Sequence, residues 1–340
     1  MNKPGRMMDI EALRGLACLL LVYYHVVGPI HGGLMLGFDS PHRLVADALV
    51  HVRMPLFTFI SGFIFSMHSS KVTRLGKLLR SKARRLLLPL VVVGVPISLL
   101  QALAPGVNKD VSIGAALFSF VIPINHFWFL QAIFLVFCVV GVASVVGVFR
   151  RRSGTVLMLL LSSVLFLMPV ETTEIFSVSR AIYLLPFFLT GMVAHQFSDS
   201  LKTPSRYLYL GLLLGLLILQ MYLAAYSREV AIDRKSLTSL AVGFFSCLLL
   251  YGVQIKSRVL CVIGGYSFAI YLFHTVFAVA VRLAAGWVGM TNSNLLVLGE
   301  LIAGILGPIC VAIVVSKSHT LSTLILGERL SPGNSAEKTV

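Results

Sequence analysis

The chain has 340 residues, of which 57% are hydrophobic and only 12% are charged. Soluble domains carry about 25% charged residues, so this composition excludes a soluble protein and indicates a polytopic membrane protein. The net charge of +15 does not indicate nucleic-acid binding, because the basic residues cluster in loops between apolar segments.

Ten apolar segments are long enough, or nearly long enough, to cross about 30 Å of hydrocarbon. They cover residues 11–30, 47–67, 86–104, 126–148, 155–170, 179–197, 207–226, 237–254, 263–284 and 295–316. We therefore expect an all-α bundle of about ten transmembrane helices, with a membrane domain over residues 1–325 and a short polar tail over 326–340. A further apolar stretch, 111–123, is too short to span and predicts a re-entrant or interfacial segment.

The lysines and arginines of the loops predict the orientation. If successive loops alternate sides, nineteen of the 28 basic residues fall on one side and six on the other, while Arg14, Arg53 and Arg282 fall within spans. The positive-inside rule then places both termini in the cytoplasm. The loop 227–236 is discordant, because it puts three cations on the other side, although two carboxylates in the same loop partly offset them.

Cysteine use and the N-terminal segment narrow the class further. The five cysteines lie in or beside apolar segments without a CxxC pair, which argues against a disulfide framework or a cysteine-based zinc site. The first apolar segment does not resemble a cleaved signal peptide, because it is too long, is interrupted by charge and lacks a small-x-small cleavage site. No internal repeat is evident.

The first apolar segment carries Arg14 and His25 on one helical face. Their spacing gives three turns plus about 20°, and it places His25 roughly 16 Å further along the axis. Glu11 lies three residues before Arg14 and can pair with it. An arginine suits bidentate phosphate binding, and a neutral histidine can take a proton from a hydroxyl, so the pair predicts a functional site. The alternatives are an interfacial anchor for Arg14 and a structural hydrogen bond for His25.

A basic loop precedes the third apolar segment and holds seven cations between Lys71 and Arg85. The positive-inside rule and contact with anionic lipid explain most of them. Arg80, Arg84 and Arg85 lie near the start of the span at roughly helical spacing, so they could complete an anion-binding pocket with Arg14.

The second span contains the pair Ser61-Gly62 and, nearer its outer end, Arg53. Small residues inside a span predict close helix packing. Arg53 is either a snorkelling side chain or part of an outward-facing acceptor cavity.

Polar residues in the fourth and ninth spans are further candidates. His126, Trp128 and Phe129 open the fourth span and are typical of the aromatic belt at a membrane interface, although Trp128 could instead wall a cofactor or sugar pocket. Tyr271 and His274 belong to a polar stripe on one face of the ninth span, which predicts a position in the bundle interior.

In this order, the segments resemble the acyltransferase-3 family of integral membrane O-acyltransferases. The family's hallmark is an arginine followed by a histidine in the first span, met here as Arg14 and His25. PLFTFISGF in the second span, ARRLLLP before the third, HFWFL in the fourth and YSFAIYLFH in the ninth also resemble its recurrent blocks. Two departures are Glu11, where many members have aspartate, and Phe268, which replaces a tyrosine of the ninth-span block.

The resemblance implies a membrane enzyme of the bacterial plasma membrane. It would move an acyl group, most often acetyl, from cytoplasmic acetyl-CoA to a hydroxyl of a carbohydrate, such as a cell-surface polysaccharide or a lipid-linked glycan. It implies contact with membrane lipid, no metal and no nucleic acid. The candidate site comprises His25 and Glu11 as catalytic residues, Arg14, Arg80, Arg84, Arg85 and Trp128 at the donor, and Arg53, Ser61, Tyr271 and His274 at the acceptor.

Two other functions fit the same composition. A transporter or permease for a glycan precursor or small solute would also need many spans with buried polar groups. Transporters, however, often show paired broken helices or a repeat, and neither is evident in this sequence. A lipid-interacting structural subunit of a glycan-assembly complex would use Arg14 only as an anchor.

Overall fold

The fold was analysed in a computed structural model that describes residues 4–28, 33–68, 74–103, 111–170, 173–201 and 204–328. Within these ranges the chain is helical and contains no strand, which confirms the predicted all-α membrane bundle. The tail predicted for 326–340 lies outside the described residues from position 329 onward.

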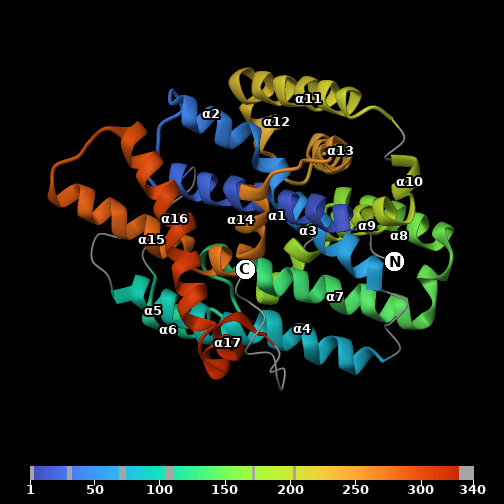
Figure 1. Ribbon diagram of the computed structural model, residues 1–340, viewed down its shortest axis with the longest axis horizontal. Helices are drawn as coiled ribbons and strands as arrows, with labels where there is room; N and C mark the ends of the chain where they lie inside the picture. Colours follow the sequence, from blue (N-terminus) through green and yellow to red (C-terminus); the bar gives the residue numbers. More distant parts are fainter. Residues whose placement is uncertain are drawn as a thin grey trace.

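The helices follow one another with short connections (Figure 1). Their bounds are α1 Pro4–Val27, α2 Pro41–Ala48, α3 Val50–His68, α4 Leu75–Pro89, η2 Leu90–Gly94, α5 Val95–Leu103, α6 Ile113–Leu117, η3 Asn125–Phe127, α7 Trp128–Val146, α8 Arg152–Leu167, α9 Val178–Gln196, α10 Ser198–Leu201, α11 Arg206–Tyr226, α12 Arg228–Ile232, α13 Leu237–Val253, α14 Arg258–Gly265, α15 Ser267–Trp287, α16 Ser293–Val315 and α17 His319–Leu326.

Each of the ten predicted segments coincides with a helix. Among the described residues, eight helical stretches are long and apolar enough to cross a membrane, and the shorter apolar helices α8 and α13 match the fifth and eighth predicted segments. The stretch 111–123 forms only the short helix α6 and turns, so it is indeed too short to span. The number of spans and the side of the termini stay predictions.

The basic stretch before the third span was wrongly predicted to be a loop. From Leu75 it is helical and continues through α4, η2 and α5 to Leu103. Leucine, arginine and lysine are strong helix formers, and the first proline of the stretch is Pro89, so the helix extends through the charged residues. The cations therefore lie on defined faces of a helix.

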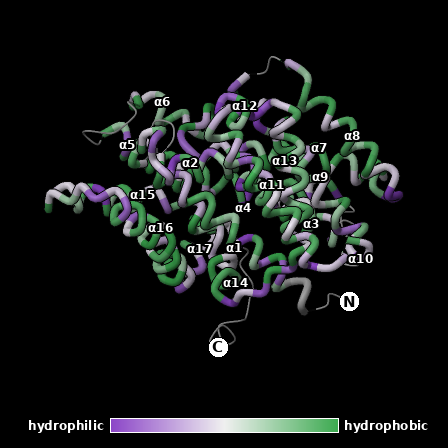
Figure 2. Tube along the Cα trace, turned by 90° about the horizontal axis from the view of Figure 1, so that it is seen from above, coloured by the Kyte–Doolittle hydropathy of each residue, from purple (hydrophilic) through white to green (hydrophobic). Residues whose placement is uncertain are grey.

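The outer surface of the bundle is apolar, as a lipid environment requires. Leu160 of α8, Leu212 of α11 and Leu306 of α16 are all exposed. Figure 2 shows hydrophobic residues continuing over the outside of α8 and α16. In water such a surface would be strongly unfavourable, so the long helices are stable with this exterior only in hydrocarbon.

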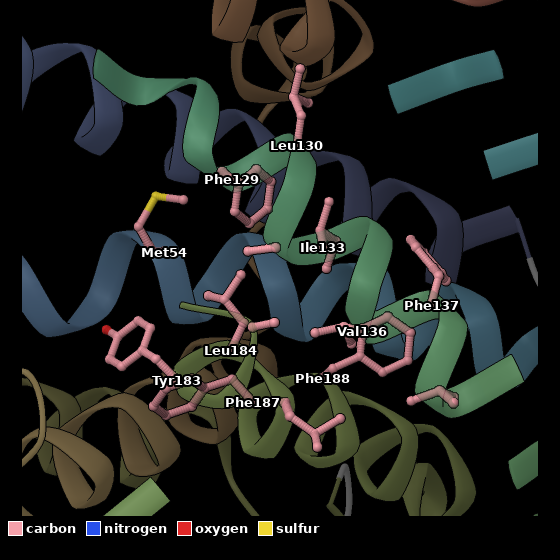
Figure 3. Packing of buried hydrophobic residues seen from close by; sticks show 14 of the residues in the cluster. Met54, Phe129, Leu130, Ile133, Val136, Phe137, Tyr183, Leu184, Phe187 and Phe188 are labelled. Atoms are coloured by element: carbon pink, nitrogen blue, oxygen red, sulfur yellow. The ribbon is translucent and has the colours of Figure 1, made fainter. Parts of the chain in front are cut away.

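The largest buried cluster lies between α7, α9 and α3 (Figure 3). Phe137 of α7 meets the ring of Phe188 of α9 edge to face, with 5.2 Å between centroids. Behind this layer α3 and α9 cross with their backbones in contact, since a Cβ on Gly62 would overlap the Phe188 carbonyl oxygen. The sequence-based prediction of close packing at Ser61-Gly62 is thereby confirmed.

The helix α1 is held by a second glycine contact. A Cβ on Gly15 would overlap the carbonyl oxygen of Leu260, and one on Gly264 would overlap that of Glu11. These contacts fix α1 against α14 beside Arg14, and α15 continues from α14 after a break at Tyr266. The position of the first span relative to the ninth is therefore set by direct backbone contact.

Replacing Gly62 with alanine is expected to destabilise the protein by about 1–3 kcal/mol, because the added methyl forces α3 and α9 apart. The matched control is Gly211→Ala in α11, where nothing lies within 4 Å of the added atom. That change should be neutral or slightly stabilising, since alanine favours helix over glycine. Thermal unfolding of the purified protein in detergent measures both, and equal shifts would contradict the proposed contact.

Candidate active site

Near the start of α1, Arg14 and Glu11 form the ion pair that their three-residue spacing predicted. Arg14 Nη1 donates to both carboxylate oxygens of Glu11, at 3.0 and 2.9 Å. Both side chains are about one quarter exposed. The pair holds the guanidinium against α1, and Arg14 also lines an adjacent cavity.

We call this space the Arg14 cavity; its volume is about 330 Å³. Arg14, Lys82 and Arg85 supply its positive charge, and the rest of the wall is chiefly apolar and aromatic. The lining also includes Phe57, Ile60, Ser61, Ile64, Phe65, His68, Leu78, Leu86, Phe129, Leu130, Ile133, Phe137, Ser267, Phe268 and Tyr271. A cationic group beside a narrow apolar space suits a ligand with an anionic head and a less polar arm.

The helical form of the basic stretch decides which of its cations reach the cavity. Leu78, Lys82 and Arg85 recur at helical spacing and share the face that lines it. Arg80 and Arg84 fall on other faces and do not line the cavity. Of the three arginines that the sequence suggested, the structure therefore brings only Arg85 to Arg14.

Lys82 is a cavity residue that the sequence interpretation missed. Its Nζ lies 3.8 Å from the ring centroid of Phe137. Helical periodicity extended back to Leu75 would have identified it, because it is one turn before Leu86, which also lines the cavity.

Three histidines from distant segments meet at the other end of the site. The ring centroids of His25 and His274 are 4.9 Å apart, those of His126 and His274 are 4.8 Å apart, and those of His25 and His126 are 5.8 Å apart. They come from α1, η3 and α15. We refer to them as the histidine cluster.

His126 is buried in this cluster, not exposed at the membrane interface. It is only 4% exposed, and His274 is fully buried. The sequence favoured an aromatic-belt position for His126, and the structure places it in the interior because the short helix η3 turns the chain inward before α7. No sequence signal links His126 to His25, since the two belong to different spans.

The hydrogen bonds of two of these histidines define their tautomers. His25 Nδ1 lies 2.9 Å from the Leu21 carbonyl oxygen, and His274 Nδ1 lies 2.8 Å from that of Ile270. A carbonyl oxygen only accepts, so each Nδ1 carries the hydrogen, and the Nε2 of each neutral ring keeps its lone pair. A lone pair of this kind is what a general base requires.

Tyr271 connects the Arg14 cavity with the histidine cluster. It lines the cavity, and its hydroxyl donates to the His126 carbonyl oxygen at 2.5 Å. Its ring also meets that of His126 edge to face at 5.3 Å. Ser61 lines the same cavity from α3. The sequence grouped Ser61 and Tyr271 with Arg53, whereas the structure brings both to the Arg14 cavity. This cavity ends against Tyr271, which contacts His126 of the histidine cluster.

A second space, the Arg53 cavity, is lined in part by Arg53 and Tyr183 and has a volume of about 190 Å³. Arg53 is 5% exposed and its guanidinium lies 3.2 Å from the ring centroid of Tyr24, which in turn meets His25 edge to face at 5.6 Å. Trp128 lines this cavity. The structure therefore separates Trp128 from Arg14 and brings it to Arg53.

The described residues contain no group of three or more histidine, cysteine, aspartate or glutamate side chains that could hold a metal ion. The three rings of the histidine cluster pack against one another instead.

These features define a class: a helical membrane protein whose interior holds a cluster of imidazoles and two cation-bearing cavities. A family model described as an acyltransferase domain matches residues 8–317, nearly the whole chain. The chain belongs to this acyltransferase-3 family and is a membrane acyltransferase. No curated protein and no solved structure shows significant similarity to it.

Replacing Tyr271 with phenylalanine should destabilise the protein by about 1–3 kcal/mol, because the buried carbonyl of His126 loses its hydroxyl donor. Tyr222→Phe on the exposed surface of α11 is the matched control, and its effect should stay within about 0.5 kcal/mol. Denaturant unfolding in detergent gives both values. An unchanged midpoint for Tyr271→Phe would contradict the hydrogen bond.

Proposed function

We propose that this acyltransferase moves an acetyl group from acetyl-CoA to a hydroxyl of a carbohydrate acceptor, with His25 as the general base. The observation that carries the proposal is the position of the His25 ring. Its Nδ1–H donates to Leu21, so Nε2 is free to accept. The ring lies next to Tyr24, which contacts Arg53 of one cavity, and next to His126, which contacts Tyr271 of the other. A base between two binding spaces suits a transfer between two substrates.

The Arg14 cavity would bind the donor. Arg14, Lys82 and Arg85 supply the charge that the phosphates of CoA require, and guanidinium groups bind phosphate through paired hydrogen bonds. A volume of about 330 Å³ suits the pantetheine arm, and the nucleotide would stay at the mouth. Glu11 would fix the orientation of Arg14, and Ser61 and Tyr271 would contact the arm.

In the proposed reaction, Nε2 of His25 takes the proton of the acceptor hydroxyl while the hydroxyl oxygen bonds to the thioester carbonyl carbon. The tetrahedral intermediate collapses, the C–S bond breaks, and the CoA thiolate takes the proton from the imidazolium. The products are an acetyl ester and the free thiol of CoA. His274 and His126 would hold the His25 ring in place through the ring contacts already described.

A second route, in which His25 Nε2 carries the acetyl group transiently, uses the same lone pair. It differs by a covalent acetyl-imidazole intermediate. Incubation with labelled acetyl-CoA in the absence of acceptor would label the protein by this route only.

His25→Ala should lower acetyl transfer by roughly 10²- to 10⁴-fold, which is the usual contribution of general base catalysis. Transfer of labelled acetyl from acetyl-CoA to glycan is measured with purified protein in proteoliposomes. His319→Gln, an exposed histidine at the start of α17, is the control and should keep full activity. Undiminished transfer by the His25 variant would refute the assignment.

Arg85→Gln should raise the KM for acetyl-CoA by roughly three- to tenfold, because a phosphate contact in a partly hydrated cavity is lost. The matched control is Arg80→Gln, on the same helix but outside the cavity, whose KM should change by less than about twofold. Initial rates at varied acetyl-CoA measure both values. Equal effects of the two variants would argue against donor binding in this cavity.

A further inference from the structure

The described cations of the less basic side fall into two groups. Arg43 and Arg228 both pair with Asp47, and both lie over the ring of Phe38, at 4.9 and 3.7 Å. These two arginines are neutralised by one carboxylate and one aromatic face, and they tie α2 to α12. Their structural contacts therefore explain part of the positive charge on this side of the protein.

The other described cations of that side gather at one place. Arg180, Arg234 and Lys235 line the Arg53 cavity together with Arg53 itself. Three different segments supply them: the start of α9, the loop before α13 and the start of α3. A topology signal would spread cations over the loops, whereas four cations around one cavity indicate a binding site.

The acidic groups near this cavity offset only part of its charge. Among the described residues, Glu174 is the one carboxylate in the lining, and it pairs with Arg180 at 3.3 Å. The carboxylate of Asp233, next to the lining, accepts a hydrogen bond from the backbone N–H of Lys235 at 3.0 Å. Among the described residues, positive charge therefore remains in excess at this cavity.

Arg53 is the strongest single indication. It is only 5% exposed, its Nε has no hydrogen-bond partner among the described residues, and its guanidinium is stacked on Tyr24. Burial of a guanidinium without an anion is costly, so the arrangement favours a negatively charged ligand.

We infer that the Arg53 cavity binds the carboxylate or phosphate group of an acidic sugar, so that the acceptor is an anionic glycan. Guanidinium groups bind such oxyanions through paired hydrogen bonds. The contact of Tyr24 with both Arg53 and His25 would place a hydroxyl of the same sugar near the base. A volume of about 190 Å³ limits the bound part to a single small residue.

The role of the bound sugar as acceptor rests on the proposed function, whereas anion binding itself does not. Binding is therefore measured without acetyl-CoA. The chain has two tryptophans, and Trp128 lines the cavity while Trp287 is 88% exposed, so Trp287→Phe leaves Trp128 as the only tryptophan, which is excited selectively over tyrosine. This protein, in phosphatidylcholine nanodiscs, is titrated with glucuronate, glucose 6-phosphate and glucose.

Glucuronate, glucose 6-phosphate or both should change the emission of Trp128 in a saturable manner, at concentrations at least about tenfold below those needed for glucose. Whichever of the two binds more tightly identifies the anionic group. An equal response to glucose and to both charged sugars would overturn the inference.

Substitutions in the same reporter protein test the residues. Arg53→Gln and Arg234→Gln should weaken binding of the charged sugar roughly tenfold, and Lys235→Gln roughly threefold. Lys317→Gln, an exposed lysine outside both cavities, should change nothing. Since Arg234 and Lys235 are exposed, their variants stay informative even if Arg53→Gln fails to fold. An equal effect of Lys235→Gln and Lys317→Gln would overturn the inference.

Nanodiscs containing phosphatidylglycerol separate a sugar from a lipid headgroup. If this lipid changes Trp128 emission while neither charged sugar binds, the cavity takes an anionic lipid and the acidic-acceptor inference is overturned. Acidic-sugar binding that survives in His25→Ala, together with lost transfer, supports both proposals. Binding combined with full transfer by His25→Ala would refute only the catalytic role of His25.

Discussion

The absence of water from the bilayer interior is the constraint on which this structure depends. A charged side chain there must face protein or a polar cavity. Arg14 meets this requirement by pairing with Glu11, and Arg282 by a bidentate pair with the buried Glu300 at 2.9 and 2.6 Å. Because these groups cannot face lipid, they fix the rotation of their helices about their own axes. The polar faces of α1 and α15 consequently point inward, and the histidine cluster forms where those faces meet.

The inward-facing polar residues form a site only because the helices that carry them also pack closely against one another. Glycine contacts bring the backbone of α1 against α14 and that of α3 against α9. Without Cβ atoms at these crossings, the helices pack with almost no gap. Cavities remain beside Arg14 and beside Arg53. In the proposed reaction, the two cavities would hold the charged donor and the hydroxyl acceptor apart until they meet at His25.

The sequence predicted much of the site that lies within single helices and little of what joins them. The pairing of Glu11 with Arg14 and the close packing at Gly62 followed from helical spacing and side-chain size. His126 was placed in an aromatic belt because a histidine beside a tryptophan at the start of a span has the same pattern in either position. Lys82 was missed because the basic stretch was predicted as a loop, and a loop has no faces.

The sequence by itself determined the class of protein, the helices and the pairing of Glu11 with Arg14, since hydropathy and 3.6-residue periodicity are local properties. The family hallmark in α1 was equally visible. Only the tertiary structure decided that His25 meets His126 and His274, that Trp128 belongs with Arg53, and that the loop cations Arg180 and Arg234 share one cavity. Contacts between residues far apart in the chain depend on helix crossings, and these are set by three-dimensional packing that no single segment encodes.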